Sequence, residues 1–330
     1  MAVSDKLQSI LDSKAAIKAA IEAKGVADVG DVLANYPDKI ASIQTGGGSS
    51  TGFTGHADVE GLKAIGWTDD DIAYYQSYGV NWNEEDDEYH KVPEDNIALY
   101  GVLTADNIQD YKDILVYCPK IDTSGRTSLA NLFQKCFSLV AIPMLDTSSV
   151  TNISYMFHYC YSLVSVPQFD TKSVTSMSNM FDNCYSLVSV PQFDTKSVTN
   201  MGYMFSTCYS LTSVPLFDTS SVTSMSNMFD NCRSLTSVPL LDTSSVTNIS
   251  SIFNYCYSIQ TANMQNLKKS LDISMTSLLI KESLLYIINN EAATSPITIT
   301  LSAYCYNKYN TDEEVTAALA NHPNVSLASV

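Results

Sequence analysis

Residues 170–193 read Asp170-Thr-Lys-Ser-Val-Thr-Ser-Met-Ser-Asn-Met-Phe-Asp-Asn-Cys-Tyr-Ser-Leu-Val-Ser-Val-Pro-Gln-Phe193. This stretch decides the fold because the chain repeats it, and residues 218–241 match it at 19 of 24 positions. Three sequence features of the unit recur at a constant interval of 24 residues. They are Cys136, Cys160, Cys184, Cys208, Cys232 and Cys256; Pro119, Pro143, Pro167, Pro191, Pro215 and Pro239; and the Asp-Thr pairs starting at Asp122, Asp146, Asp170, Asp194, Asp218 and Asp242. A period this regular predicts a repeat solenoid.

Each 24-residue unit is expected to form one turn of this solenoid. Apolar residues within a unit recur at intervals of two to four, so no unit is expected to contain a long helix. Because one turn cannot bury its apolar side alone, the turns stack at about 4.8 Å and share hydrogen bonds and one core. The period lies in the range of leucine-rich repeats. We therefore predict a mainly β repeat solenoid of leucine-rich-repeat type over residues 114–260, with six turns.

The composition excludes several classes of protein. The chain has 330 residues, 45% of them hydrophobic and 16% charged, with 18 Lys and Arg against 35 Asp and Glu. The net charge of -17 repels phosphate backbones and anionic lipid headgroups, so neither nucleic acid nor a membrane surface is an expected partner. No run of 18 apolar residues is present, and the start from Met1 to Lys14 lacks the apolar stretch of a secretory signal. We expect neither membrane insertion nor export by the signal-peptide route.

Residues 1–45 are expected to form a helical docking or oligomerisation segment. Ser4 is a suitable N-cap for a helix that runs to about Lys24, and Gly25 suits the position just past its end. The apolar positions of this helix, at spacings of three and four, are Leu7, Ile10, Ile17 and Ile21. Residues 46–52 are rich in Gly and Ser and are expected to be a flexible linker that uncouples this segment from the rest.

Two atypical segments are expected to flank the solenoid, because the open ends of a stacked core need to be covered. Residues 53–113 are predicted to be an acidic helical N-terminal cap, with helices starting after Thr68 and Thr104. Residues 261–330 are predicted to be an α/β C-terminal cap. Its expected elements are a helix near Ser283 to Asn290, a strand from Ile297 to Tyr304 and a helix after Thr311.

The cysteine spacing argues against a zinc site and against a disulfide framework. No Cys-x-x-Cys or Cys/His cluster is present, and equivalent cysteines of stacked turns have parallel side-chain vectors. We therefore expect the six repeat cysteines, from Cys136 to Cys256, to form a buried ladder of free thiols, while the state of Cys118 and Cys305 stays open. Pairs such as Met180-Phe181 are expected to fill the core rather than to form an exposed adhesive stripe.

Two acidic features admit more than one interpretation. The Asp-Thr pairs are expected to cap the turn after Pro by bonding backbone N–H groups; the alternative is a row of carboxylates that binds calcium or a sugar. The acidic run from Glu84 to Glu88 lacks the alternating pattern of a calcium loop, so a solvated loop is favoured over a cation site.

No catalytic constellation is present in the sequence. The four histidines, His56, His90, His158 and His322, are scattered, and no Ser or Cys nucleophile motif adjoins them. The glycines at 46–48 are followed by Ser-Ser rather than by Gly-Lys-Ser, so no phosphate loop is expected. We predict that the chain is not an enzyme and that it holds no metal or other cofactor.

A binding surface is predicted beside the cysteine ladder. The residue after each ladder cysteine is aromatic in five of the six units. We call this set the tyrosine column: Phe137, Tyr161, Tyr185, Tyr209, Arg233 and Tyr257. If the column points outward, it suits a glycan or a protein, because Tyr offers an apolar ring and a hydroxyl at low entropic cost. The alternative is that the rings only pack over neighbouring turns.

The repeat motif resembles BspA-type leucine-rich repeats, which occur in surface proteins of anaerobic gut and oral bacteria and in genes of their phages. The resemblance is carried by Asn179-Met-Phe-Asp-Asn-Cys-Tyr-Ser-Leu-Val-Ser-Val-Pro191 and by Asp170-Thr-Lys-Ser-Val-Thr175. It covers about residues 114–260. It implies an adhesive or binding role without enzymatic activity, and it brings no fixed set of binding residues.

The start of the chain is similar to short segments of phage tail and fibre proteins. The similarity is carried by Leu7-Gln-Ser-Ile-Leu-Asp-Ser-Lys-Ala-Ala-Ile-Lys-Ala-Ala-Ile-Glu-Ala-Lys-Gly25 and by Leu33-Ala-Asn-Tyr-Pro-Asp-Lys-Ile-Ala-Ser-Ile43. The two resemblances predict a phage virion component of fibre or decoration type, a homo-oligomer with a trimer favoured, located on the particle surface. Its partners are expected to be other virion proteins through the N-terminal segment and a host glycan or protein through the solenoid. A bacterial cell-surface adhesin and a cytosolic protein-binding scaffold are the alternatives.

Overall fold

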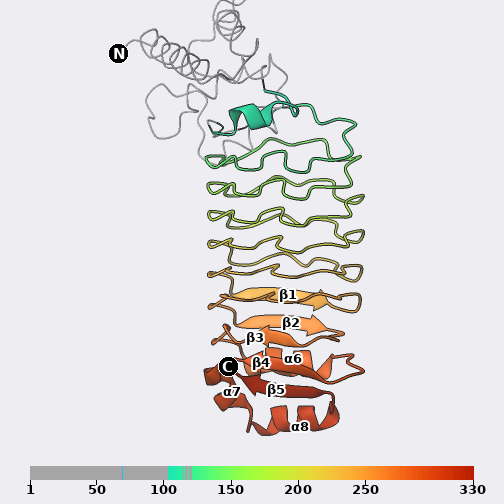
Figure 1. Ribbon diagram of the computed structural model, residues 1–330, viewed down its shortest axis with the longest axis vertical. Helices are drawn as coiled ribbons and strands as arrows, with labels where there is room; N and C mark the ends of the chain where they lie inside the picture. The colour runs from blue at the N-terminus through green and yellow to red at the C-terminus, as the bar shows by residue number, and fades with distance from the viewer. Residues whose placement is uncertain (1–68, 70–102, 114, 116–117, 119–120) are drawn as a thin grey trace, which may run out of the picture.

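The computed structural model describes residues 69, 103–113, 115, 118 and 121–330. Over residues 121–330 the chain forms a stack of coils, and helices and longer strands lie at the C-terminal end of the stack (Figure 1). The predictions for residues 1–45, for the linker 46–52 and for most of the acidic segment 53–113 lie outside the described residues. They include the attachment positions Leu7, Ile10, Ile17 and Ile21.

Equivalent residues of successive units lie side by side, so each 24-residue unit is one turn of a solenoid. Parallel bridges join Ser128 to Asn152, Asn152 to Ser176, and each following pair up to Asn248. Backbone hydrogen bonds also connect the turns; the Phe181 N–H, for example, donates to the Met204 carbonyl at 2.9 Å. The sequence period is therefore the period of the backbone, and the observed fold of this region is a repeat solenoid.

Extended strands are fewer and shorter here than a mainly β solenoid implies, which corrects the predicted fold class. Among the described residues up to 265, the strands are β1 (Ser237–Asp242) and, just past residue 260, β2 (Thr261–Gln265), which pair in parallel with Ser237 opposite Thr261. Single bridges and backbone hydrogen bonds hold the other turns together.

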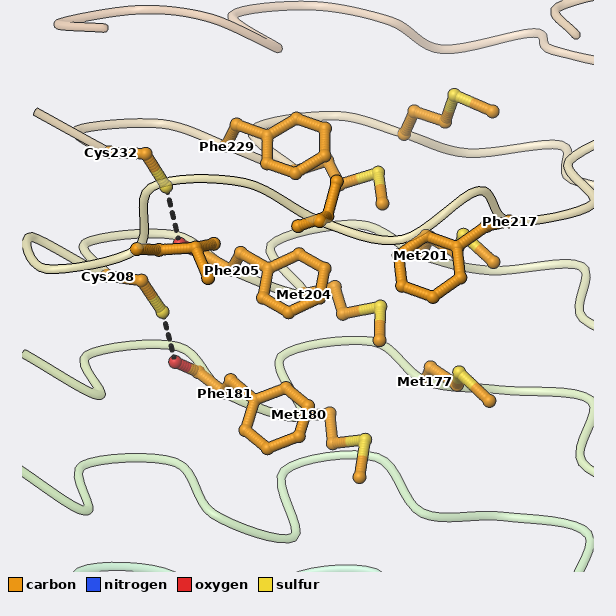
Figure 2. Packing of buried hydrophobic residues seen from close by; sticks show 14 of the residues in the cluster. Met177, Met180, Phe181, Met201, Met204, Phe205, Cys208, Phe217, Phe229 and Cys232 are labelled. Carbon is orange, nitrogen blue, oxygen red and sulfur yellow. Dashed lines mark hydrogen bonds between the residues drawn. The ribbon is translucent and has the colours of Figure 1, made fainter. Parts of the chain in front are cut away.

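The interior of the solenoid is built from stacked aromatic rings. Consecutive rings lie 5.5–5.8 Å apart between centroids and within 11° of parallel. We call this fully buried set the phenylalanine ladder: Phe133, Phe157, Phe181, Phe205, Phe229 and Phe253. Figure 2 shows the ladder rings with the buried side chains of Met180 and Met204 beside them. The packing is repeated from turn to turn because the same residue types recur at the same place.

The six ladder cysteines are buried and unpaired, and each occupies the same place in its turn. From Cys160 onward, each thiol donates a hydrogen bond to the carbonyl of the ladder phenylalanine in the preceding turn, at 2.9–3.1 Å. Figure 2 shows two of these bonds, from Cys208 to Phe181 and from Cys232 to Phe205. Cys118 and Cys305 are also buried, and none of the eight cysteines, all of which lie among the described residues, forms a disulfide.

Two positions in each unit adopt the left-handed backbone conformation without a glycine, with φ between 53° and 65°. One lies two residues before the ladder phenylalanine, and the other directly precedes the ladder cysteine. They are Asn131, Tyr155, Asn179, Tyr203, Asn227 and Ser251, and Lys135, Tyr159, Asn183, Thr207, Asn231 and Tyr255. Asn tolerates this conformation, whereas a β-branched residue is strained in it. Thr207 is the β-branched residue of the set.

Thr207→Asn is expected to raise the free energy of unfolding by about 1 kcal/mol, because it removes that strain. Asn already occupies the equivalent position in two other units, as Asn183 and Asn231, so the framework accepts it. Urea denaturation followed by circular dichroism measures the change. Thr212→Asn, at an exposed position without positive φ, is the matched control and should bring no gain. Equal changes in both variants would contradict the strain.

Beyond residue 260 the chain continues to coil, with longer turns. β3 (Leu271–Ile273), β4 (Ile297–Leu301) and β5 (Val325–Ser329) form a parallel sheet with β4 in the middle. Leu271 lies opposite Ile299, which in turn lies opposite Leu327, so these turns are 28 residues long (299 − 271 and 327 − 299). The 24-residue motif ends here as predicted, and the helices and strand predicted for residues 261–330 are observed near their expected bounds, but the turns continue to stack through them.

Three helices occupy the longer turns: α6 (Lys281–Asn289), α7 (Ala303–Tyr309) and α8 (Glu313–Asn321). The strand expected to reach Tyr304 ends earlier, at Leu301, because the Ser302 side chain accepts the Cys305 N–H and caps α7. Asp312 caps α8 in the same way. α6 contacts both β2 and α8, so the helices cover the last turns of the core.

A short 3₁₀ helix, η1 (Ile108–Tyr111), precedes the first unit. An α-helix starting after Thr104 is predicted here, and that prediction is wrong. The Asn107 side-chain oxygen accepts the Thr104 N–H at 2.7 Å, which closes a tight turn before η1. Gln109 then donates to the Asn131 carbonyl at 3.2 Å and connects this segment to the first unit.

Candidate recognition surface

The tyrosine column stacks along the solenoid. From Phe137 to Tyr209, consecutive rings lie 4.5–5.1 Å apart between centroids and within 20° of parallel. The Arg233 guanidinium continues the column, 4.9 Å from the centroid of the Tyr209 ring. The rings therefore pack over neighbouring turns, and they also remain partly exposed to solvent.

This stacking determines which part of each ring a ligand can reach. The rings of Tyr161 and Tyr185 have a stacked neighbour on both sides, which leaves their edges and hydroxyl groups accessible. Burial, and after it the neighbouring Tyr161, raises the pKa of Tyr185, so its phenol stays uncharged at neutral pH. The column offers ring edges and hydroxyls at intervals of about 4.8 Å rather than open ring faces.

Further exposed tyrosines lie in the same turns. Tyr155, Tyr203 and Tyr255 occupy left-handed positions and are 37%, 41% and 44% exposed. Tyr257, the last member of the tyrosine column, meets Tyr255 edge to face at 6.2 Å. We define the recognition edge as the segments that carry these residues in all six turns: 131–137, 155–161, 179–185, 203–209, 227–233 and 251–257. Its exposed side chains are mostly Tyr, Asn and Ser, which are typical of protein-binding surfaces.

A polar column lies on the same edge, and no sequence motif pointed to it. It consists of the residue after each ladder phenylalanine: Gln134, His158, Asp182, Ser206, Asp230 and Asn254. His158 connects the first three members, with Nδ1 3.1 Å from the Gln134 amide nitrogen and Nε2 3.2 Å from the Asp182 carboxylate. Ser206 lies two turns from His158, so Ser206 and His158 do not form a nucleophile–base pair.

The two carboxylates of the polar column have only polar or imidazole partners. The Asp182 side chain is 11% exposed and contacts His158 and the Asn183 amide. Asp230 accepts a hydrogen bond from Asn254 at 2.9 Å. Burial raises the pKa of Asp230, and repulsion from Asp182 adds to the effect. Among the described residues, neither carboxylate forms an ion pair with a lysine or arginine.

The Asp-Thr pairs serve as turn caps. In all six units the Asp Oδ1 accepts the backbone N–H two residues later, at 2.8–3.2 Å. The following threonine connects the turns; Thr171 Oγ1 donates to the Asp194 carbonyl at 2.9 Å. Hydrogen bonds from Ser220 lower the pKa of Asp218, so this carboxylate stays ionised. These contacts give the pairs a structural role and supply no evidence for a calcium or sugar row.

An open groove of about 810 Å³ runs along five successive turns, beside the Asp-Thr caps. Gln168 and Gln192 line it, and each donates its amide to the carbonyl of the next turn, at 2.7 and 2.6 Å. Lys172 is paired with Asp170 at 2.7 Å. Leu216, which is 59% exposed, adds an apolar wall. Most polar groups that line this groove therefore already form hydrogen bonds or ion pairs with other residues of the solenoid.

The described residues assemble neither a metal site nor a membrane span. No group of three His, Cys, Asp or Glu side chains in this part of the chain is placed to hold a metal ion. None of the helices in that part is long and apolar enough to cross a bilayer. His322 Nδ1 lies 3.2 Å from Glu291 in the C-terminal turns, away from the recognition edge in sequence. His56, His90 and the acidic run from Glu84 to Glu88 lie outside the described residues.

Comparison with protein families finds a match over the repeat region. Residues 127–234 and 164–269 match the family described as "Mycoplasma protein of unknown function, DUF285". Together these ranges contain all six residues of the phenylalanine ladder and all six ladder cysteines. The match and the stacked turns together support a repeat protein with leucine-rich-repeat, BspA-like features.

One solved structure that is similar to the chain is the "Crystal structure of T. pallidum Leucine Rich Repeat protein (TpLRR)". The similarity covers 66% of this chain and 88% of that chain, with 18% sequence identity and a TM-score of 0.35. No curated protein matches the chain.

Proposed function

We propose that the chain is a non-catalytic recognition protein, a fibre- or decoration-type component of a phage particle that presents the recognition edge to a receptor on the host cell. The observation that carries the proposal is the partly exposed tyrosine column, held in register by the stacked turns. A rigid aromatic array loses little conformational entropy on binding. The similarity of residues 7–43 to phage tail and fibre segments supports the location on a particle.

In this proposal, residues 1–45 attach the chain to other virion proteins or to copies of itself, with a trimer favoured. In such an oligomer, several weak contacts with the receptor strengthen one another, because binding of one copy raises the effective concentration of the others at the receptor surface. The alternative is a bacterial cell-surface adhesin; the matching family is described from a bacterial protein, of Mycoplasma, whose function is unknown. Surface proteolysis of intact bacterial cells distinguishes the two, because only the adhesin is cleaved on cells that produce no particles.

The chain is expected in purified particles, and Tyr185→Ser/Tyr209→Ser is expected to reduce their adsorption to host cells by about tenfold or more. The substitutions remove two stacked hydroxyl-bearing rings while leaving the buried ladders intact. Mass spectrometry of particles purified by density gradient tests the location, and plaque-based adsorption assays test the surface.

Thr175→Ser/Thr199→Ser is the matched control. These threonines are exposed and bond to the preceding turn through Oγ1, outside the recognition edge. Their replacement should leave adsorption unchanged. Particles that lack the chain, or particles whose adsorption is insensitive to loss of both tyrosines, would refute the proposal.

A further inference from the structure

One position of the recognition edge alternates between a large and a small side chain. It is the first left-handed position of each unit, occupied by Asn131, Tyr155, Asn179, Tyr203, Asn227 and Ser251. The residues of the parallel bridges alternate with the same period, as Ser128, Asn152, Ser176, Asn200, Ser224 and Asn248. The surface here therefore repeats every two turns, whereas the backbone repeats every turn.

The fold does not require this alternation. All six left-handed residues have nearly the same φ, between 53° and 63°, whether the side chain is Asn, Tyr or Ser. Tyrosines in adjacent turns are also compatible with the stack, because Tyr161, Tyr185 and Tyr209 lie one above the other in the tyrosine column. The two-turn period therefore has no origin in the packing of the backbone.

The alternation places a short side chain between two exposed rings. Tyr155 and Tyr203 are 37% and 41% exposed and lie about 9.6 Å apart along the stack, with Asn179 in the turn between them. Asn179 is itself partly exposed, so the place between the rings is open to solvent. Each tyrosine lies about 4.8 Å along the stack from this place, and stacked rings of the tyrosine column are 4.5–5.1 Å apart. One flat ring of a ligand therefore fits over Asn179.

The polar groups around this place are available to a ligand. Among the described residues, the side-chain amide of Asn179 and the hydroxyls of Tyr155 and Tyr203 have no hydrogen-bond partner. In that part of the chain the Tyr203 ring has no ring neighbour, and the Tyr155 ring meets only His158 of its own turn, at 5.4 Å and 62°. The three side chains are uncharged, so they suit an uncharged ligand that has a flat ring and hydrogen-bond acceptors.

A polyproline II segment has nearly the same period as this surface. It has three residues per turn and rises about 3.1 Å per residue, so every third residue recurs on one side after about 9.3 Å. Two turns of the solenoid rise about 9.6 Å. Residues on one side of a β-strand recur after about 6.7 Å, and two turns of an α-helix rise about 10.8 Å. Prolines at positions i, i+3 and i+6 would therefore reach Asn131, Asn179 and Asn227 in turn.

We propose that the recognition edge binds a proline-rich segment of its receptor in the polyproline II conformation, with one proline ring over Asn179, between Tyr155 and Tyr203. This inference rests on the proposed recognition function and names the class of its partner. Proline-rich segments bind to aromatic surfaces because their conformation is formed before binding and little entropy is lost. Their carbonyl groups have no internal partner, so the Asn179 amide and the two tyrosine hydroxyls donate hydrogen bonds to them.

A peptide of nine prolines tests the site with the full chain, labelled with ¹⁵N-asparagine. We expect a saturable shift of the Asn179 side-chain amide with this peptide, and little or none with a flexible nine-residue peptide of Gly and Ser. Equal binding of the two peptides would overturn the proposal, because a preformed conformation would then bring no advantage.

Two variants test the site with residues that equivalent units already contain. Tyr155→Ser/Tyr203→Ser removes both rings and introduces the residue type of Ser251, and Asn179→Tyr fills the place between the rings as Tyr155 and Tyr203 fill theirs. Each variant should weaken binding of the nine-proline peptide by about tenfold or more, as measured by calorimetry. Circular dichroism checks that both remain folded. Unchanged affinity in either folded variant would overturn the proposal.

Tyr286→Ser/Tyr304→Ser is the matched control, because it removes two tyrosines from α6 and α7, outside the recognition edge. It should retain binding of the nine-proline peptide. A loss as large as that of Tyr155→Ser/Tyr203→Ser would overturn the proposal, since the peptide would then not depend on the rings beside Asn179.

Two peptides of equal composition test the period itself. Acetyl-Pro-Ser-Ser-Pro-Ser-Ser-Pro-amide has a proline at every third residue, whereas acetyl-Pro-Ser-Pro-Ser-Pro-Ser-Ser-amide has none three residues from another. The first should bind roughly fivefold more tightly, because it can place a second proline beside a ring. Equal affinities would overturn the match between the two periods.

Cellohexaose provides the sugar arm of the titration. A sugar ring over Asn179 would bury several hydroxyl groups, which need more hydrogen-bond partners than this place supplies. A saturable Asn179 shift with cellohexaose and none with the nine-proline peptide would overturn the proposal in favour of a glycan partner. That result leaves the location on a particle and the role of the tyrosine column standing, since mass spectrometry and the adsorption of particles decide those.

Discussion

Phe205→Ala is expected to lower the free energy of unfolding by about 3–5 kcal/mol, a large share of the stability of an ordinary domain. Phe205 is fully buried. Its ring stacks on Phe181 at 5.6 Å and on Phe229 at 5.7 Å, so truncation removes aromatic contacts to both neighbouring turns. Each such pair contributes about 0.5–1.5 kcal/mol beyond its buried area. Because each turn contacts mainly its neighbours, a cavity here weakens the stack on both sides.

Tyr209→Ala is the matched control for Phe205→Ala, because it truncates an aromatic residue of the same unit that is only partly buried. It should cost about 1 kcal/mol or less. Urea denaturation followed by circular dichroism measures both variants, and a smaller m-value for Phe205→Ala would show that the solenoid separates into two unfolding units. A loss below about 1 kcal/mol for Phe205→Ala, with the m-value unchanged, would contradict a continuous aromatic core.

The thiols of the folded chain are expected to react with dithiobis(nitrobenzoate) at pH 8 on the order of 10³-fold more slowly than a free peptide thiol. Burial raises the pKa of Cys136 and Cys256 to about 12, and that of the four cysteines between them well above the ordinary value. Since only the thiolate reacts, a raised pKa leaves almost none of the reactive form. The rate should therefore keep rising by about tenfold per pH unit past pH 9, where a free thiol approaches its plateau.

Unfolding in guanidinium provides the control for thiol reactivity, because none of the eight cysteines is in a disulfide and all should then react at once. The folded chain should also resist oxidation to disulfides, since each ladder thiol from Cys160 onward points to the phenylalanine carbonyl of the preceding turn rather than to another sulfur. Rapid labelling of two or more thiols under native conditions would show that the ladder is open to solvent.

The spacing of residues was sufficient to predict the stack and its interior. A 24-residue period becomes one backbone turn, so equivalent residues such as Cys184 and Cys208 lie one above the other. Apolar residues at these places have no other low-energy location than the shared core. The tyrosine column was predicted for the same reason, because Tyr185 and Tyr209 differ by one period and must be neighbours.

Other features of the structure could not be predicted from residue types, because they depend on the geometry of the folded backbone. The polar column was not predicted because its members, such as His158, Asp182 and Ser206, occupy equivalent positions but have chemically different side chains. The left-handed residues were missed because Tyr and Thr, rather than Gly, occupy several of them. The helices and the strand after residue 260 were predicted, but the continued stacking was not, because β3, β4 and β5 share no motif with the earlier units and their period changes to 28.

The amino-acid sequence alone determined that this protein is a stack of equivalent turns with a sulfur and aromatic interior, because a strict period admits one way of burying six copies of the same apolar face. The tertiary structure decided what the surface offers. Only the tertiary structure shows that His158 Nε2 contacts the Asp182 carboxylate and that the ring faces of the tyrosine column are covered. The physical reason is that burial follows from the type and spacing of the residues. The contacts between side chains of successive turns depend instead on the direction in which the backbone of each turn points those side chains.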